Sequence, residues 1–225
     1  MIVIKRGKEP NSLLKFRKEN PDADYESDMP TDVLKDIREQ MWEEQRCLCA
    51  YCMKKIEAPS VVRIEHCRPR HPRDEQEHDK KATLDFKWML GVCYGNSMVR
   101  GVKPEDKTCD AHRGNIELTV NPFDEMSVRK IKYKADGSIY SEDAEINKDV
   151  TETLNLNCQA LSLPQTRKNV LMAEKKRIMR KCRGKSQDAF MRELERTYAS
   201  LVEKRNLTPY CGIIISWLES KLKIS

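Results

Sequence analysis

The sequence predicts an α+β fold in which a small metal-centred ββα module is carried on helices. Cys49 and Cys52 form a C-x2-C pair with the spacing of zinc ligands, and a β-branched stretch follows at 61–66. Apolar residues alternate on both sides of an Asp136-Gly137 turn, which is typical of a hairpin. From about residue 148 the apolar residues recur at helical spacing.

The composition limits the class of protein. The chain has 225 residues, with 39% hydrophobic, 35% charged and a formal net charge of +6. No apolar run approaches the roughly 20 residues of a membrane-spanning helix, and residues 1–8 lack the apolar core of a signal peptide. We therefore expect a cytoplasmic protein without membrane attachment, whose nine cysteines are mostly reduced.

We expect three regions along the chain. Residues 1–46 would form an N-terminal arm and helix, 47–146 a zinc-containing module with the hairpin, and 147–225 a helical region. In the first region, residues 1–8 are β-prone and 18–32 have the composition of a polar loop. A helix is expected from Thr31, which would cap it, with Leu34, Ile37 and Met41 on one face.

The other elements follow from local patterns. A strand is expected at 61–66, a short helix after Cys109 that ends at Gly114, and alternating residues at 116–120. Val128, Ile131, Tyr133, Ile139 and Tyr140 would belong to the hairpin. In the last region Pro164 would interrupt a helix, whereas Phe190, Leu194, Tyr198 and Leu201 share one helical face and a final helix follows Pro209.

Four cysteines are candidates for a structural zinc site. Cys49 and Cys52 supply half of it, and Cys93 and Cys109 can complete a tetrahedron. Such a site leaves no position open for water, so its role would be to hold together a module too small to build its own core. Cys47 is a competing ligand. The remaining helical cysteines are interpreted as core residues: Cys158, Cys182 and Cys211.

An acid–histidine pair lies beside the cysteines. Glu65 and His66 end the expected strand, and Asp110 follows Cys109 directly. Hydrolysis of a phosphodiester requires an activated water and a Lewis acid on the phosphate. Histidine suits the base, and two carboxylates suit a hard cation such as Mg²⁺. These residues indicate a small metallonuclease.

The same residues carry a family resemblance. Cys49-Ala-Tyr-Cys52, Ile64-Glu65-His66-Cys-Arg-Pro69 and Cys109-Asp110 resemble a zinc-stabilised HNH endonuclease, and more narrowly the PtuB-like HNH proteins of Septu and retron-associated anti-phage defence systems. The resemblance extends to Asn121-Pro122 and Leu154-Asn-Leu-Asn157 and so covers most of the chain.

The resemblance implies a ββα-metal fold and a role for each residue of the site. His66 would be the general base, and Glu65 and Asp110 would bind the catalytic Mg²⁺ or Mn²⁺, with His112 as the alternative ligand. The middle asparagine of the HNH pattern is absent, because Trp88 and Met89 stand where it is expected. Asn96, Asn115 or a backbone group would have to orient His66 instead.

Basic residues suggest a nucleic-acid interface, with DNA favoured over RNA. Arg63, Arg68 and Arg70 flank the expected site and suit phosphate. Residues 167–185 contain nine lysines or arginines against one acid, Glu174. A helix with this bias can follow a phosphate backbone, but it could equally be a solvated face or a docking surface for an acidic partner. The residues expected to bind nucleic acid there are Lys175, Lys176, Arg177, Arg180 and Lys181.

The expected function is therefore a metal-dependent HNH endonuclease. The resemblance also implies an effector role in anti-phage defence. The partner would be an ABC/SMC-like ATPase subunit, in some systems together with a retron complex. Two alternatives stay open: a non-catalytic zinc-ribbon module that binds nucleic acid or protein, and the same nuclease acting on RNA. His71 and His78, in the charged loop after the site, are expected to be exposed to solvent.

Overall fold

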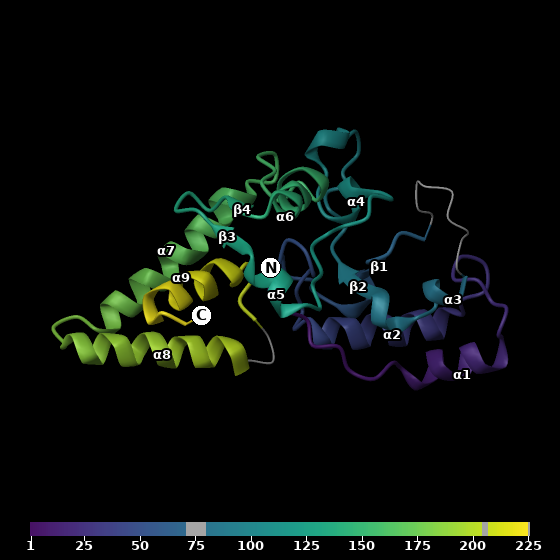
Figure 1. The fold of residues 1–225 in the computed structure, drawn as a ribbon, viewed down its shortest axis with the longest axis horizontal. Helices are drawn as coiled ribbons and strands as arrows, with labels where there is room; N and C mark the ends of the chain where they lie inside the picture. The colour runs from purple at the N-terminus through teal and green to yellow at the C-terminus, as the bar shows by residue number, and fades with distance from the viewer. Residues whose placement is uncertain (71–79, 204–206, 225) are drawn as a thin grey trace.

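The computed structural model describes residues 1–70, 80–203 and 207–224. The described part is a mixed α+β structure in which two small antiparallel sheets are surrounded by helices (Figure 1). The helices α1, α2 and α3 lie at one end of the molecule and α7, α8 and α9 at the other (Figure 1). The elements are α1 Asn11–Glu19, α2 Thr31–Glu44, β1 Arg63–His66, α3 Lys80–Thr83, β2 Met89–Val92, α4 Asp110–Arg113, α5 Glu125–Arg129, β3 Ile131–Tyr133, β4 Ile139–Ser141, α6 Ala144–Lys148, α7 Leu163–Lys181, α8 Gln187–Glu203 and α9 Gly212–Leu222.

The N-terminal region differs from the sequence expectation in three details. Residues 1–8 form no strand, and α1 occupies part of the segment expected to be a loop. The α2 helix was predicted correctly, but Thr31 is its first helical residue and makes no capping hydrogen bond, because Pro30 occupies the cap position. Its buried face is formed by Val33, Ile37 and Met41, a face rotated slightly from the expected one.

The centre of the molecule is a β-hairpin followed by a one-turn helix. Strands β1 and β2 pair antiparallel, with Ile64 opposite Gly91 and His66 opposite Met89. The short helix α4 begins directly after Cys109 and ends at Gly114, whose φ of +57° is a conformation that glycine adopts without strain. Both the strand and the short helix were predicted from sequence. Glu65 lies near the end of β1 and Asp110 at the start of α4, and both residues line the same cavity.

The second hairpin, β3–β4, confirms the prediction around Gly137, but two flanking expectations were wrong. Val128 lies in α5 rather than in a strand. Residues 116–120 also form no strand, because the carboxylate of Asp149 accepts the backbone N–H groups of Thr119 and Val120 at 2.7 and 2.8 Å. These two amides are therefore satisfied without a neighbouring strand.

The C-terminal helices form a second core. Helices α8 and α9 occur as expected, whereas Pro164 lies in the first turn of α7 and begins that helix rather than interrupting it. Proline is tolerated there because its missing N–H has no partner within the helix. The second core contains Leu171 and apolar residues of α8 and α9, and Leu48 and Met53 from the segment of the C-x2-C pair also belong to it. Leu154 and Leu156 pack in the first core.

Among residues 1–70, 80–203 and 207–224, no helix combines the length and the apolar character needed to cross a bilayer.

Gly137 connects the two halves of the fold, and its replacement by alanine should be strongly destabilising. Its φ is +89°, and an added Cβ would overlap the carbonyl oxygen of Pro164 at the start of α7. Gly184 has a similar φ of +74° but open space around it. We expect Gly137→Ala to lower the free energy of unfolding by about 2 kcal/mol more than Gly184→Ala, because only the first adds a steric overlap to the backbone strain. Urea denaturation at fixed zinc measures this difference, and equal losses would contradict it.

Candidate metal centre and catalytic cleft

Four cysteine sulfurs converge at the base of the central hairpin. The Sγ atoms of Cys49, Cys52, Cys93 and Cys109 all lie within 4.8 Å of one another. The closest pairs are Cys52–Cys93 at 3.7 Å, Cys93–Cys109 at 3.8 Å and Cys49–Cys109 at 3.9 Å. Zn–S bonds of about 2.3 Å place the sulfurs of a tetrahedral site about 3.8 Å apart. The cluster therefore fits a structural zinc ion, as predicted.

The cysteines come from three separate segments. Cys49 and Cys52 lie in the turn after α2, Cys93 follows β2, and Cys109 precedes α4. Sulfur contacts, the largest with Cys49, raise the pKa of Cys109, because several negative charges cannot share so small a volume without a cation. Cys47 is buried but does not belong to the cluster, and Cys158 and Cys211 are buried as expected, with Cys182 partly exposed.

A polar cleft of about 420 Å³ lies next to this cluster. Its walls come from β1, from α4 and from the segments that flank them. The structure brings five of the predicted site residues together in its lining: Arg63, Glu65, His66, Arg70 and Asp110.

The imidazole of His66 is held by the backbone. Its Nε2 lies 2.8 Å from the carbonyl oxygen of Thr83, and the ring of Tyr25 meets it edge-on at 4.6 Å. A carbonyl oxygen can only accept, so Nε2 carries the proton and Nδ1 keeps its lone pair. Burial lowers the pKa of His66 to about 4, so the ring is neutral at pH 7. Within the described part of the chain, Nδ1 has no hydrogen-bond partner.

The orientation of His66 resolves the question of the absent asparagine. Met89 stands opposite His66 in the hairpin and is fully buried, so it contributes packing only. Asn96 donates to the carbonyl of Asp106 at 3.1 Å, and Asn115 lines the cleft. Among the groups considered to orient His66, the backbone makes the contact: the ring donates a hydrogen bond to the carbonyl oxygen of Thr83.

Glu65 is bound by a buried arginine that sequence reasoning missed. Arg113, whose side chain is 1% exposed, makes an ion pair with the Glu65 carboxylate. The same guanidinium donates to the carbonyl oxygens of His66, Cys67 and Ile116 at 2.6–2.8 Å. Tyr51 donates to Glu65 at 3.2 Å. Arg113 therefore ties α4 to the end of β1.

Asp110 faces Glu65 across the cleft wall. Burial, followed by a hydrogen bond with Asp110, raises the pKa of Glu65 to about 8, while Arg113 acts in the opposite direction. On its outer side Asp110 pairs with Arg63, whose Nε lies 2.5 Å from Oδ2. Two facing carboxylates favour a proton or a cation between them. Arg63, whose side chain is 43% exposed, would compete with such a cation for Asp110.

His112 does not join this group. Its Nδ1 lies 3.0 Å from the carbonyl oxygen of Thr153, and it does not line the cleft. The short helix α4 turns it away from Asp110 toward the segment before Leu154. The structure therefore places His112, the alternative ligand, outside the cleft that Glu65 and Asp110 line.

The arginines near the site divide into two kinds. Arg63 and Arg70 line the cleft, and Arg70 also pairs with Glu26 at 2.6 Å. Arg68 instead stacks on Trp88, with its guanidinium carbon 4.0 Å from the ring centre, and is not a lining residue. His71 and His78 lie outside the described residues.

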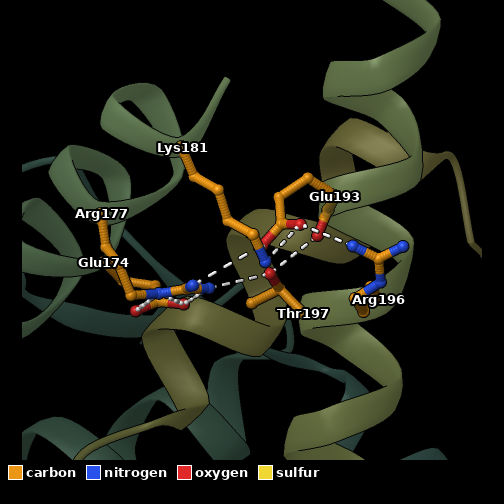
Figure 2. Close-up of polar contacts among 6 residues, drawn as sticks. All are labelled: Glu174, Arg177, Lys181, Glu193, Arg196 and Thr197. Atoms are coloured by element: carbon orange, nitrogen blue, oxygen red, sulfur yellow. Dashed lines mark hydrogen bonds and ion pairs between the residues drawn. The ribbon is translucent and has the colours of Figure 1, made fainter. Parts of the chain in front are cut away.

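Two basic residues of α7 form ion pairs with acids within the protein. Figure 2 shows Arg177 and Lys181 pointing toward Glu193 of α8, at 3.6 and 2.8 Å, and Arg196 reaching the same carboxylate. Arg177 and Lys181 are among the residues expected to bind nucleic acid, and in the structure each pairs with Glu193 while its side chain stays 41% and 45% exposed, respectively.

Other positions of the stretch also differ from that expectation. Lys175 lies over the ring of Trp217, and Arg167 is buried with hydrogen bonds to Gly137 and Leu156. Lys176 and Arg180 are exposed. The helix therefore offers a smaller basic surface than its sequence suggests.

Two of the groups that shape the site leave no clear sequence signal. The carbonyl of Thr83 is a backbone group that any residue could supply. Arg113 follows Asp110 by three residues, so the spacing alone placed it on the same short helix. Only its burial against Glu65 shows its role.

No protein-family model matches the chain, and no curated protein is significantly similar to it.

Loss of one cysteine should abolish zinc binding. We expect the purified protein to contain one zinc per chain, and Cys49→Ser to lose it and to unfold around β1 and β2, because a hydroxyl is a poor replacement for a thiolate ligand. Elemental analysis and circular dichroism measure both effects. Cys182→Ser is the matched control and should keep its zinc; retention by Cys49→Ser would contradict the ligand set.

Arg113→Met should destabilise the protein by about 3–5 kcal/mol, because it leaves the carboxylate of Glu65 buried without its partner. Arg129 forms an exposed pair with Glu125, so Arg129→Met should cost about 0.5 kcal/mol or less. Chemical denaturation at fixed zinc compares the two variants. Adding Glu65→Gln to Arg113→Met should recover part of the loss, and no recovery would contradict the assignment.

Proposed function

We propose that this chain is a metal-dependent endonuclease of the HNH type that hydrolyses phosphodiester bonds, with DNA as its favoured substrate. The observation that carries the proposal is the orientation of His66, whose neutral ring presents an unprotonated Nδ1 in a cleft shared with two facing carboxylates. A base in this state at neutral pH suits the activation of water.

In the proposed reaction, Nδ1 of His66 takes a proton from a water molecule, and the water oxygen forms a bond to phosphorus. The bond from phosphorus to the 3′ oxygen breaks, and this oxygen takes a proton from a solvent water molecule, which leaves a 5′-phosphate and a 3′-hydroxyl. Glu65 and Asp110 would hold Mg²⁺ or Mn²⁺, which would supply Lewis-acid stabilisation of the phosphate and of the departing oxygen. Arg63 and Arg70, which line the cleft, suit contact with the flanking phosphates.

The resemblance to PtuB-like HNH proteins extends the proposal to a biological role. The chain would act in the cytoplasm as the effector of an anti-phage defence system, together with an ABC/SMC-like ATPase and in some settings a retron complex. A nuclease that contacts backbone rather than bases tolerates many sequences, so it must be restrained in the host. Control by a partner meets that need.

A second candidate function is a non-catalytic zinc module that binds nucleic acid or protein. One observation favours it: each carboxylate of the cleft is already paired with an arginine, Glu65 with Arg113 and Asp110 with Arg63. Under this alternative, the pairs would persist when divalent cations are added.

Replacement of His66 separates the two functions. We expect His66→Ala to lower plasmid nicking in Mg²⁺ or Mn²⁺ by about 10²–10⁴-fold, because the general base is lost. The variant should keep its zinc and its circular dichroism spectrum. His112→Ala is the matched control, and since His112 points away from the cleft it should nick within a few-fold of the parent protein. Undiminished nicking by folded His66→Ala would exclude the catalytic role.

The nature of the substrate is tested in one buffer with plasmid DNA and a structured RNA. Faster cleavage of the plasmid is expected. Cleavage of the RNA alone would transfer the same chemistry to RNA.

A further inference from the structure

The segment between the last two cysteines of the cluster exposes apolar side chains to solvent. We call residues 94–108, which connect β2 to α4, the inter-cysteine loop. Met98 is 75% exposed and Val99 56% exposed, and Tyr94 is also exposed. Met98 and Val99 are neighbours in the chain, so two exposed apolar side chains lie together here, next to the cleft that Ser97 lines. In Figure 1 this part of the chain lies at the edge of the molecule beside α4.

The inter-cysteine loop has a defined shape. Cys93 and Cys109 close its two ends in the metal cluster. Inside it, Thr108 donates to the carbonyl of Gly95 at 3.0 Å, and the side chain of Asn96 donates to Asp106 at 3.1 Å. From outside, the amide of Asn155 donates to the carbonyls of Glu105 and Lys107 at 2.8 and 2.9 Å. These hydrogen bonds fix the two arms of the loop and so hold its exposed tip in a defined position.

Gly95 shows how tightly the base of the loop is closed. Its φ is +52°, and a Cβ at this position would overlap the carbonyl oxygen of Thr108. Only glycine allows the two arms of the loop to approach so closely. The tip is held at a set place because the arms below it are joined.

The loop is continuous with the catalytic cleft. Ser97, which directly precedes Met98, lines the cleft, and so does Lys107 from the other arm. Arg100 and Lys103 add exposed positive charge near the tip, against Glu105 and Asp106 further along. An apolar tip next to cations and next to a phosphodiester cleft has the chemistry of proteins that insert a side chain between base pairs while they neutralise phosphates.

We propose that Met98 and Val99 form a wedge that enters the base stack of duplex DNA next to the phosphate held in the cleft. The inference rests on the proposed function and names its substrate more narrowly, as duplex DNA that is locally unstacked. Insertion would kink the duplex and turn the target phosphate toward His66. A protein partner is less suited to this surface, because the apolar tip continues directly into a cleft lined by His66, Asp110 and Lys107.

The wedge predicts a cleavage pattern. Pyrimidine–purine steps unstack most easily, so nicks should be enriched at TA and CA/TG steps although no side chain reads a base. Sequencing the ends of nicked plasmid measures the enrichment. A distribution independent of the step would contradict the wedge.

Fluorescence tests the insertion without cleavage. In the His66→Ala background, the full chain is mixed with a duplex that carries 2-aminopurine, whose emission increases when it is unstacked. We expect emission to rise about threefold or more with the native loop, and to stay near its starting value with Met98→Ser/Val99→Ser, which should also bind about tenfold more weakly. Unchanged emission while the duplex is bound, or no binding of the duplex, would overturn the proposal.

Activity provides the second measurement, in the presence of native His66. Plasmid nicking by Met98→Ser/Val99→Ser should fall at least about tenfold relative to hydrolysis of bis(4-nitrophenyl) phosphate by the same variant, because the small diester needs no unstacking. Met126→Ser, in α5 and 70% exposed, is the matched control and should leave the ratio unchanged. An unchanged ratio in the double variant would overturn the wedge. If no chain hydrolyses either substrate while the emission still rises, the nuclease proposal fails and the wedge stands.

Discussion

The convergence of four cysteine sulfurs is the constraint on which the central part of this structure depends. Each strand of the β1–β2 hairpin has four residues, and α4 is a single turn, so none of these elements is stable alone. The sulfurs join the turn after α2, the end of β2 and the start of α4. A zinc ion bound there would contribute folding free energy on the order of 10 kcal/mol or more. The positions of His66 and Asp110 depend on that connection.

A second constraint lies beside the cluster, in the buried pairing of Arg113 with Glu65. Arg113 reaches the carboxylate and three backbone carbonyls, so it fixes how α4 meets the end of β1. The pairing also sets the electrostatics of the cleft. With Arg63 on Asp110, two arginines and two facing carboxyl groups form one network, in which burial and Asp110 raise the pKa of Glu65. Arg63 is the exposed member of this network, whereas Arg113 is buried.

The electrostatics of the C-terminal helices follow a different principle. The sequence of α7 is strongly basic, yet Arg177 and Lys181 are used to pack α7 against α8 through Glu193, which is only 5% exposed (Figure 2). Cations engaged in this way hold helices together and are less able to release counterions on a nucleic acid. Near the cleft and the inter-cysteine loop, by contrast, Arg70 and Lys107 line one cavity.

The sequence by itself determined the elements whose signals are local. The C-x2-C pair, the turn at Gly137, the helix that ends at Gly114 and the amphipathic pattern of α8 each depend on residues a few positions apart. The tertiary structure decided the rest. It brought Arg113 to Glu65, oriented His66 with the Thr83 carbonyl and paired Arg177 with Glu193. These contacts join residues that are distant in the chain, or use a backbone group that every residue carries. Neither the spacing of residues nor the composition therefore predicts them.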